Sequence, residues 1–184
     1  EKFPAITPKD KPDLLLKERN IDPTGFDEVY SRLANCQSAF LSHYSLWEKC
    51  AFHNEPFLIF EHDAIVVGEL PKNLSFMHCM TIGKPSYGNY NTPAMFGVNP
   101  LTQKNYFGGA HAYMLNPSGA WALMETAQQN AEPTDVFLNK TNFPWLQELY
   151  PWISEVKDSF STIQKEEGCV AKHGYSETYR LENV

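Results

Sequence analysis

Two acidic residues that directly follow an apolar run have the types and the spacing for chemistry. The run spans residues 57–60, consists of aromatic and aliphatic residues, and is followed by Glu61 and Asp63. A continuous apolar run is typical of a strand buried on both faces, in the middle of a parallel or mixed sheet. Because an unpaired carboxylate is costly to bury, we expect the two acids where the strand leaves the sheet. In open α/β sheets that edge binds ligands.

The spacing of these acids favours a site for a divalent cation. Glu61 and Asp63 are two positions apart, so in an extended chain their side chains point to the same side. Hard carboxylate oxygens suit Mg²⁺ or Mn²⁺, which keeps several waters and takes its other ligands from substrate phosphates. The alternative is an acidic turn that only ends a strand, and the spacing alone leaves both interpretations open.

Two further residues have a structural and a chemical interpretation. His43 lies in a segment with helical spacing, where a core histidine is the more common role and contact with the sheet edge is the alternative. Asp135 stands between a proline turn and an apolar triplet. It is therefore either a helix cap or a catalytic or acceptor-binding carboxylate.

The composition predicts one globular domain over residues 1–184, with 42% hydrophobic residues and a net charge of −7. That charge argues against a general polyanion-binding surface and leaves room for a local basic groove, so nucleic acid is not excluded as a partner. No apolar run reaches the length of a membrane span. The opening residues do not resemble a signal peptide and look like the middle of a longer chain. The cysteines are widely spaced, which favours reduced thiols in a cytoplasmic protein: Cys36, Cys50, Cys79 and Cys169.

The pattern along the chain predicts strands separated by helices, and hence a single α/β domain. Helices are expected over residues 12–18, over much of 27–52 and from about 117 to 129. Strands are expected over 3–6, 57–60, 74–83 and 108–115, with another short apolar run over 64–67 and a possible strand near 169–176.

A long loop is expected over residues 84–106, which are rich in glycine, asparagine and proline. Loops longer than about fifteen residues in compact domains are usually lids or binding loops. This one also holds four aromatic residues: Tyr87, Tyr90, Phe96 and Tyr106. We interpret it as the acceptor-facing part of a site.

Four segments, in this order, resemble glycosyltransferase family 25, the group of bacterial lipooligosaccharide galactosyltransferases and collagen galactosyltransferases. They are similar to the family's second strand, its Leu-Ser-His-x-x-Leu-Trp helix, its Glu-Asp-Asp strand end, and its Gly-x-x-x-Tyr strand with the following helix and Pro-x-Asp. In this chain they are Phe3 to Ile6, Ala39 to Trp47, Leu58 to Ala64, and Gly109 to Leu115 with Gly119-Ala120 and Pro133-Thr134-Asp135. The shared order makes the resemblance more specific than any one segment.

The resemblance implies a GT-A-like fold, with a mixed, mostly parallel sheet flanked by helices and a nucleotide-sugar site at the sheet edge. It implies that Glu61 and Asp63 bind the metal and that Asp135 touches the acceptor or serves as the base. His111 is a candidate base or third ligand. The residues placed at the donor are Ser42, His43, Glu61 and His62.

Two departures from the family pattern stand out. His62 replaces the middle acid of Glu-Asp-Asp, which lowers the negative charge of the segment. The family's opening strand and helix, which help to hold the nucleotide base, have no counterpart before Glu1. We therefore expect either a fragment or a shortened relative.

The resulting hypothesis is a metal-dependent transferase that moves a hexose from a UDP-sugar to a hydroxyl, with Mn²⁺ or Mg²⁺ and with Asp135 or His111 as base. The acceptor is a glycan, a protein side chain or a modified nucleobase. A second hypothesis is a non-catalytic nucleotide-sugar or glycan-binding module with a degenerate transferase fold. A third is a metal-assisted hydrolase built on Asp63, His62 and His111.

Overall fold

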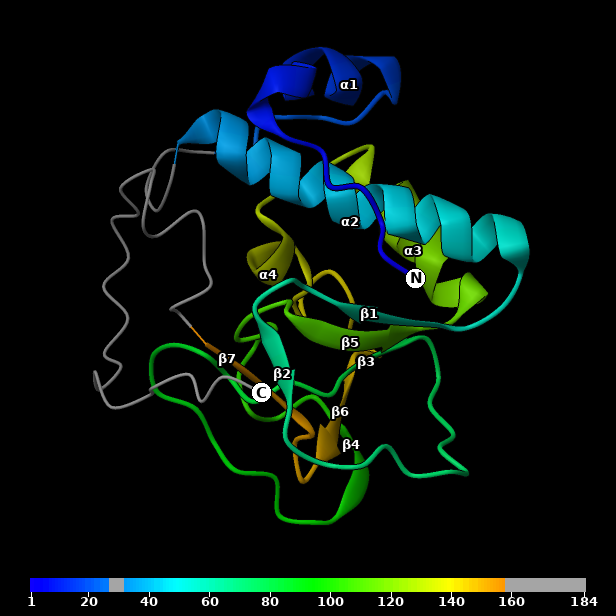
Figure 1. Ribbon diagram of the computed structural model, residues 1–184, viewed down its shortest axis with the longest axis vertical. Helices are drawn as coiled ribbons and strands as arrows, with labels where there is room; N and C mark the ends of the chain where they lie inside the picture. Colours follow the sequence, from blue (N-terminus) through cyan, green and yellow to red (C-terminus); the bar gives the residue numbers. More distant parts are fainter. Residues whose placement is uncertain (27–31, 158–184) are drawn as a thin grey trace.

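The computed structural model describes residues 1–26 and 32–157 (Figure 1). The first residues of the segment predicted to be helical, and the possible strand near 169–176, lie outside the described residues. Within them, helices pack on one face of a sheet, and the α/β class predicted from the sequence is confirmed.

The main sheet has five strands in the order β1-β5-β3-β6-β4. Only the β3–β6 pair is parallel, whereas β1–β5, β3–β5 and β4–β6 are antiparallel. The sheet is therefore mixed, as predicted, but the prediction that it is mostly parallel is wrong. The strands are β1 Phe57–Phe60, β3 Cys79–Thr81, β4 Gly97–Pro100, β5 Ala112–Leu115 and β6 Gln147–Tyr150.

Strand β1 lies at an edge of this sheet, and the prediction of a strand buried on both faces is wrong. Ile59 is 4% exposed and faces the helices, whereas Leu58 and Phe60 are 43% and 40% exposed. An apolar run also arises when an edge strand carries apolar side chains on its open face, and composition alone does not separate the two cases.

Helix α2, Leu33–His53, is one continuous helix of 21 residues. It packs against α3, Pro117–Ala127, on one face of the sheet, and α1, Pro12–Glu18, lies on its outer side (Figure 1). The buried side chains of α2 recur at helical spacing, as predicted: Phe40, Leu41, Tyr44, Trp47 and Cys50.

Aromatic rings fill the core between α2 and the sheet. Phe40 makes edge contacts with Phe26, Trp47 and Phe137 at centroid distances of 5.4, 5.5 and 5.4 Å. Burying each such ring contributes roughly 1.5–3 kcal/mol, and edge contacts between rings add about 0.5–1.5 kcal/mol. This cluster therefore joins α2 to Phe137, a residue of the short helix over residues 134–137, and to Phe26.

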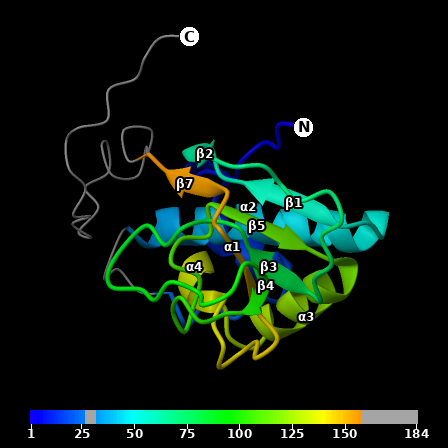
Figure 2. The same ribbon diagram turned by 90° about the horizontal axis from the view of Figure 1, so that it is seen from below.

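A two-stranded sheet lies beside the main one. It pairs β2, Ala64–Val66, with β7, Ser154–Val156, in antiparallel register (Figure 2). The residues between β1 and β2 must therefore pass from the main sheet to the small one.

Other elements differ in part from the prediction. Residues 3–6, expected as a strand, run along α2 without strand structure, and the amide of Ile6 donates to Ser42 Oγ at 2.9 Å (Figure 1). The expected loop over 84–106 contains β4, which pairs with β6. The short helices are η1, Pro8–Asp10, and α4, Thr134–Phe137. Among the helices of residues 1–26 and 32–157, none has the length and apolar character needed to cross a membrane.

Candidate active site

The chain turns sharply at Glu61. The Glu61 amide continues the β1–β5 ladder by donating to the carbonyl of His111 at 2.8 Å, and the Ala64 amide donates back to the Glu61 carbonyl at 3.2 Å. The segment is thus a turn that carries the chain into β2. Because it is not extended there, the alternation expected to place Glu61 and Asp63 on one side does not apply.

A buried network orients the Glu61 carboxylate. The Trp47 indole N–H donates to the Tyr113 hydroxyl oxygen at 2.9 Å. Burial holds the pKa of Tyr113 well above its ordinary value, so this hydroxyl keeps its hydrogen. His43 Nδ1 lies 2.9 Å from that hydroxyl, and His43 Nε2 lies 2.9 Å from Glu61 Oε1.

The donors in this network assign the tautomer of His43. An indole N–H only donates, so the Tyr113 hydroxyl accepts from Trp47 and has its own hydrogen left for His43 Nδ1. With Nδ1 accepting, the hydrogen of the neutral ring is on Nε2, where it donates to Glu61. His43 therefore positions Glu61 from behind, which combines the two interpretations that the sequence left open.

The same contacts keep Glu61 ionised. Burial alone would raise the pKa of its carboxyl, but the hydrogen bond from His43 and favourable electrostatic interactions with the nearby histidines outweigh this, and the pKa is lowered. The side chain is 35% exposed, so a ligand can still reach it. Glu61 is therefore an aimed, charged acceptor at the end of β1.

Asp63 has a different environment. It is 8% exposed, and its carbonyl accepts from the Lys157 amide at 3.1 Å. The described parts of the chain contain no group of three or more His, Cys, Asp or Glu side chains placed to hold a metal ion. Two carboxylates do not complete a metal shell, although Mg²⁺ is commonly held by one or two carboxylates and substrate phosphates. Metal binding by Glu61 and Asp63 therefore stays a prediction.

Asp135 lies in the first turn of α4 but does not cap it. The residue at the cap position is Pro133, and Asp135 Oδ1 accepts from the Val136 amide at 3.0 Å. Its other oxygen, Oδ2, accepts from the Tyr87 hydroxyl at 2.5 Å. Burial raises the pKa of Asp135, and the negative charge of Glu61 raises it further, against the hydrogen bond from Tyr87. Asp135 thus has the raised pKa of a candidate base.

His111 precedes β5 and is only 1% exposed. Its ring packs against Gly83, where a Cβ would collide with Nε2. Burial lowers the pKa of His111 in spite of the opposing charge of Glu61, so the ring is neutral at pH 7. The structure places it behind the Glu61 turn, and its predicted role as base or ligand stays a prediction.

The two remaining predicted residues lie at different places. His62 is exposed on the Glu61 turn, next to the site. Ser42 donates to the Ser38 carbonyl at 2.8 Å and accepts from Ile6, so its hydroxyl is used within the fold. A role for either residue in donor binding stays a prediction.

Sequence reasoning assigned no role to three residues of this site. Tyr113 belongs to a segment that resembles the family, and Tyr87 belongs to the loop expected to face the acceptor, but neither was singled out. Lys104 lies over the rings of Tyr87 and Tyr106, at 4.8 and 5.3 Å from their centroids. The sequence signal for Tyr113 was its place in the Gly-x-x-x-Tyr motif, and the signal for Tyr87 was the number of aromatic residues in that loop.

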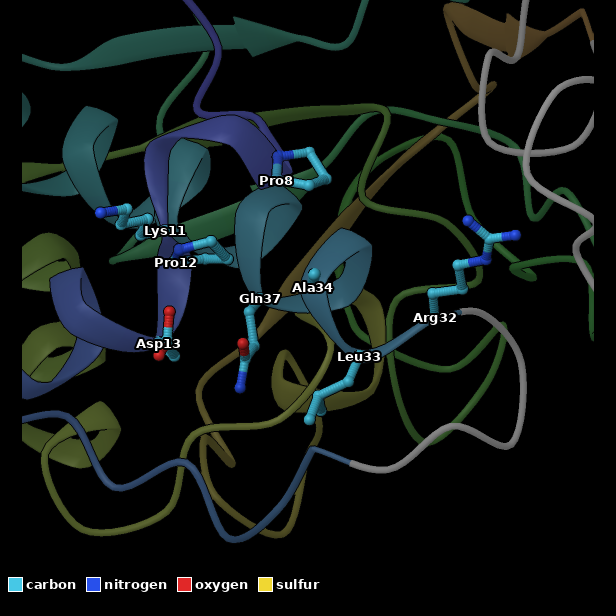
Figure 3. A pocket seen from close by; sticks show the side chains of 8 residues that line it. All are labelled: Pro8, Lys11, Pro12, Asp13, Arg32, Leu33, Ala34 and Gln37. Carbon is cyan, nitrogen blue, oxygen red and sulfur yellow. The ribbon is translucent and has the colours of Figure 1, made fainter.

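A separate hollow of about 660 Å³ lies between the first helices and the start of α2 (Figure 3). Charged side chains of both signs border it, including Lys11, Asp13 and Arg32. It contains none of the residues predicted for the site, and we do not assign it to the chemistry.

Comparison with known proteins supports the resemblance seen in the sequence. No curated protein matches the chain. Residues 1–82 match the family model described as Glycosyltransferase family 25 (LPS biosynthesis protein). The matched part includes α2, β1 and the Glu61 turn, whereas Asp135 lies outside it. Over residues 1–82, therefore, the predicted resemblance to glycosyltransferase family 25 is confirmed.

Proposed function

We propose that the protein transfers a hexose from a nucleoside-diphosphate sugar to an acceptor hydroxyl, at a site between the Glu61 turn and Asp135. The observation that carries this proposal is a pair of oriented carboxylates: His43 Nε2 lies 2.9 Å from Glu61 Oε1, and the Tyr87 hydroxyl donates to Asp135 Oδ2 at 2.5 Å. The lowered pKa of Glu61 and the raised pKa of Asp135 agree with the two roles. The family match over residues 1–82 supports glycosyl transfer as the reaction class.

Asp135 is the proposed general base. It takes the proton of the acceptor hydroxyl while that oxygen bonds to the anomeric carbon of the sugar. The bond from this carbon to the diphosphate oxygen breaks, and its electron pair leaves with the diphosphate. A base with a raised pKa is better matched to neutral pH, and such catalysis typically contributes about 10²–10⁴-fold.

Glu61 is the proposed donor-binding carboxylate. Its free lone pairs can accept from hydroxyl groups of the hexose or contribute to the predicted Mn²⁺ or Mg²⁺ site with Asp63. When bound, such an ion supplies positive charge near the diphosphate. The network through His43 holds Glu61 in place, so the entropy cost of orienting this side chain is met on folding and not during the reaction.

The test is release of nucleoside diphosphate from a panel of UDP- and GDP-hexoses in the presence of hydroxyl acceptors, with Mn²⁺ or Mg²⁺ supplied. We expect Asp135→Asn to lower turnover by about 10²–10⁴-fold, with the exposed Asp13→Asn as the matched control. Equal turnover in wild type and Asp135→Asn would remove Asp135 as the base. No release with any donor would remove the transferase proposal.

The second candidate function is a binding module without catalysis. The observation that favours it is the incomplete acid set: His62 replaces one acid, and Asp63 is buried. Calorimetry with nucleotide sugars and Mn²⁺ separates the two functions, because binding without diphosphate release indicates the module.

A further inference from the structure

Lys104 is held in place by two tyrosine rings. Its ammonium lies 4.8 Å from the ring centroid of Tyr87 and 5.3 Å from that of Tyr106. The two rings stack on each other at 6.1 Å with an interplanar angle of 26°. A cation on ring faces is attracted by their negative quadrupoles, so this lysine is ordered before any ligand arrives.

Two glycines leave the space that the Lys104 side chain occupies. A Cβ added at Gly108 would lie 3.2 Å from its Cδ, and one at Gly88 would lie 3.0 Å from its Nζ. Gly88 also has φ of +62°, a conformation that disfavours other residues. The Lys104 side chain thus runs close to the backbone at both glycines, although the nearest neighbour of Gly108 is Pro85.

The charge of Lys104 is not neutralised by a carboxylate within residues 1–26 and 32–157. The lysine ion pairs there are Lys49 with Glu1 and Lys84 with Glu155. Ring faces stabilise the cation but leave ammonium N–H groups available. In a chain of net charge −7, an ordered lysine without an acidic partner is suited to an anionic ligand.

The position of Lys104 relative to Asp135 indicates which part of the reaction it serves. Tyr87 contacts Lys104 with its ring face and donates to Asp135 with its hydroxyl, so one side chain joins the cation to the candidate base. In glycosyl transfer, the attacked carbon bears the leaving phosphate and faces the acceptor hydroxyl. A base and a phosphate-binding cation must therefore both lie near the reacting carbon, and here Tyr87 contacts both.

We propose that Lys104 binds a phosphate group at this site, with its ammonium donating hydrogen bonds to phosphate oxygen. The inference rests on the proposed function. In the transfer step the carbon–oxygen bond breaks, the electron pair remains on the phosphate oxygen, and Lys104 offsets this charge without giving up its proton. The same chemistry fits a phosphate carried by the acceptor, and the experiment distinguishes the two sources.

Calorimetry on the full chain compares UDP with uridine, and glucose 6-phosphate with glucose. Lys104→Met keeps the aliphatic stem and removes the charge, Lys104→Arg keeps the charge, and the exposed Lys72→Met is the matched control. We expect Lys104→Met to weaken binding of one phosphate ligand by about ten- to a hundredfold, the loss of a charged hydrogen bond. Binding of the unphosphorylated partner, and all binding by Lys72→Met, should be unchanged.

The phosphate ligand that loses affinity in Lys104→Met shows whether Lys104 binds the donor or the acceptor. Loss confined to UDP places the donor diphosphate on Lys104, and loss confined to glucose 6-phosphate places an acceptor phosphate there. Equal phosphate affinity in wild type and Lys104→Met, or a wild type that binds neither phosphate ligand, overturns the proposal. Should Lys104→Met fail to fold, Lys104→Gln, which also removes the charge, provides the test, and its phosphate binding should depend less on salt than that of wild type.

The test of the phosphate site and the test of the proposed transferase function can fail independently. A wild type that binds UDP through Lys104 and transfers no sugar would remove the transferase proposal and keep the phosphate site. A wild type that transfers sugar, with a Lys104→Met variant of unchanged UDP and glucose 6-phosphate affinity, would do the reverse.

Discussion

His43 Nε2 lies 2.9 Å from Glu61 Oε1, which joins the middle of α2 to the turn after β1. The histidine is buried, and Tyr113 and Trp47 fix its tautomer, so the contact is made by a rigid donor. Two sequence segments that resemble the same family, the helix around His43 and the strand end around Glu61, are therefore parts of one device. Together they orient the partly exposed carboxylate of Glu61.

His43→Leu should release this carboxylate. The leucine removes both ring nitrogens, so Glu61 loses its donor and the Tyr113 hydroxyl loses its acceptor. A buried hydroxyl left without a partner costs about 1–3 kcal/mol of unfolding free energy. The pKa of Glu61 should rise, because the hydrogen bond that lowers it is gone. His43→Gln, which can still donate to Glu61, is the conservative control. Chemical denaturation and the titration of Glu61 by NMR measure both effects, and an unchanged Glu61 pKa in His43→Leu would contradict the assigned network.

Asp135 should make stability fall as pH rises. Its pKa is raised above the ordinary value of 3.8, so between that value and its folded pKa the native state binds more protons than the unfolded state. The contribution of Asp135 to stability is therefore full below pH 3.8 and is lost as pH rises through the folded pKa. Relative to Asp135→Asn, wild type should lose stability over this window. Denaturant unfolding of both proteins across pH measures the difference, and a difference that is constant with pH would contradict the raised pKa.

Tyr87→Phe should move the activity profile. The Tyr87 hydroxyl lowers the pKa of Asp135, so its removal raises that pKa further. The base must be ionised, and the rise of kcat/KM with pH should therefore shift to higher pH in the variant. The phenyl ring keeps the stack under Lys104, so affinity for UDP should be retained. A shift to lower pH, or no shift, would show that ionisation of Asp135 does not cause the rise of kcat/KM with pH.

The local elements of this fold could be predicted from sequence, and the relations between them could not. The helical spacing of α2 and the strand end at Glu61 depend on neighbouring residues, and both appear as expected. The edge position of β1 depends on which strands pair with it, and its apolar residues carry no signal of that. The contact of Tyr87 with Asp135 spans 48 positions and depends on how a long loop folds back. His43 was a candidate, but its role behind Glu61 required the position of Tyr113.

Gly83→Ala should destabilise the site through His111. An added Cβ would collide with the buried imidazole, and overpacking of this kind typically costs about 1–3 kcal/mol. In a His111→Ala background the ring is absent, so the same substitution should cost less. A double-mutant cycle by denaturant unfolding measures the coupling. Equal costs in the two backgrounds would show that His111 does not pack on Gly83 in solution.

Mn²⁺ binding should require a phosphate ligand. Glu61 and Asp63 supply at most two protein carboxylates, and the described residues add no third ligand, so the chain alone should bind Mn²⁺ weakly. With UDP present, phosphate oxygens complete the shell, and the electron paramagnetic resonance signal of free Mn²⁺ should fall. Asp63→Asn should weaken this binding about tenfold or more, with the exposed Glu69→Gln as control. Sugar transfer at full rate in excess chelator would contradict a role for the metal and would leave Lys104 as the proposed source of positive charge at the diphosphate.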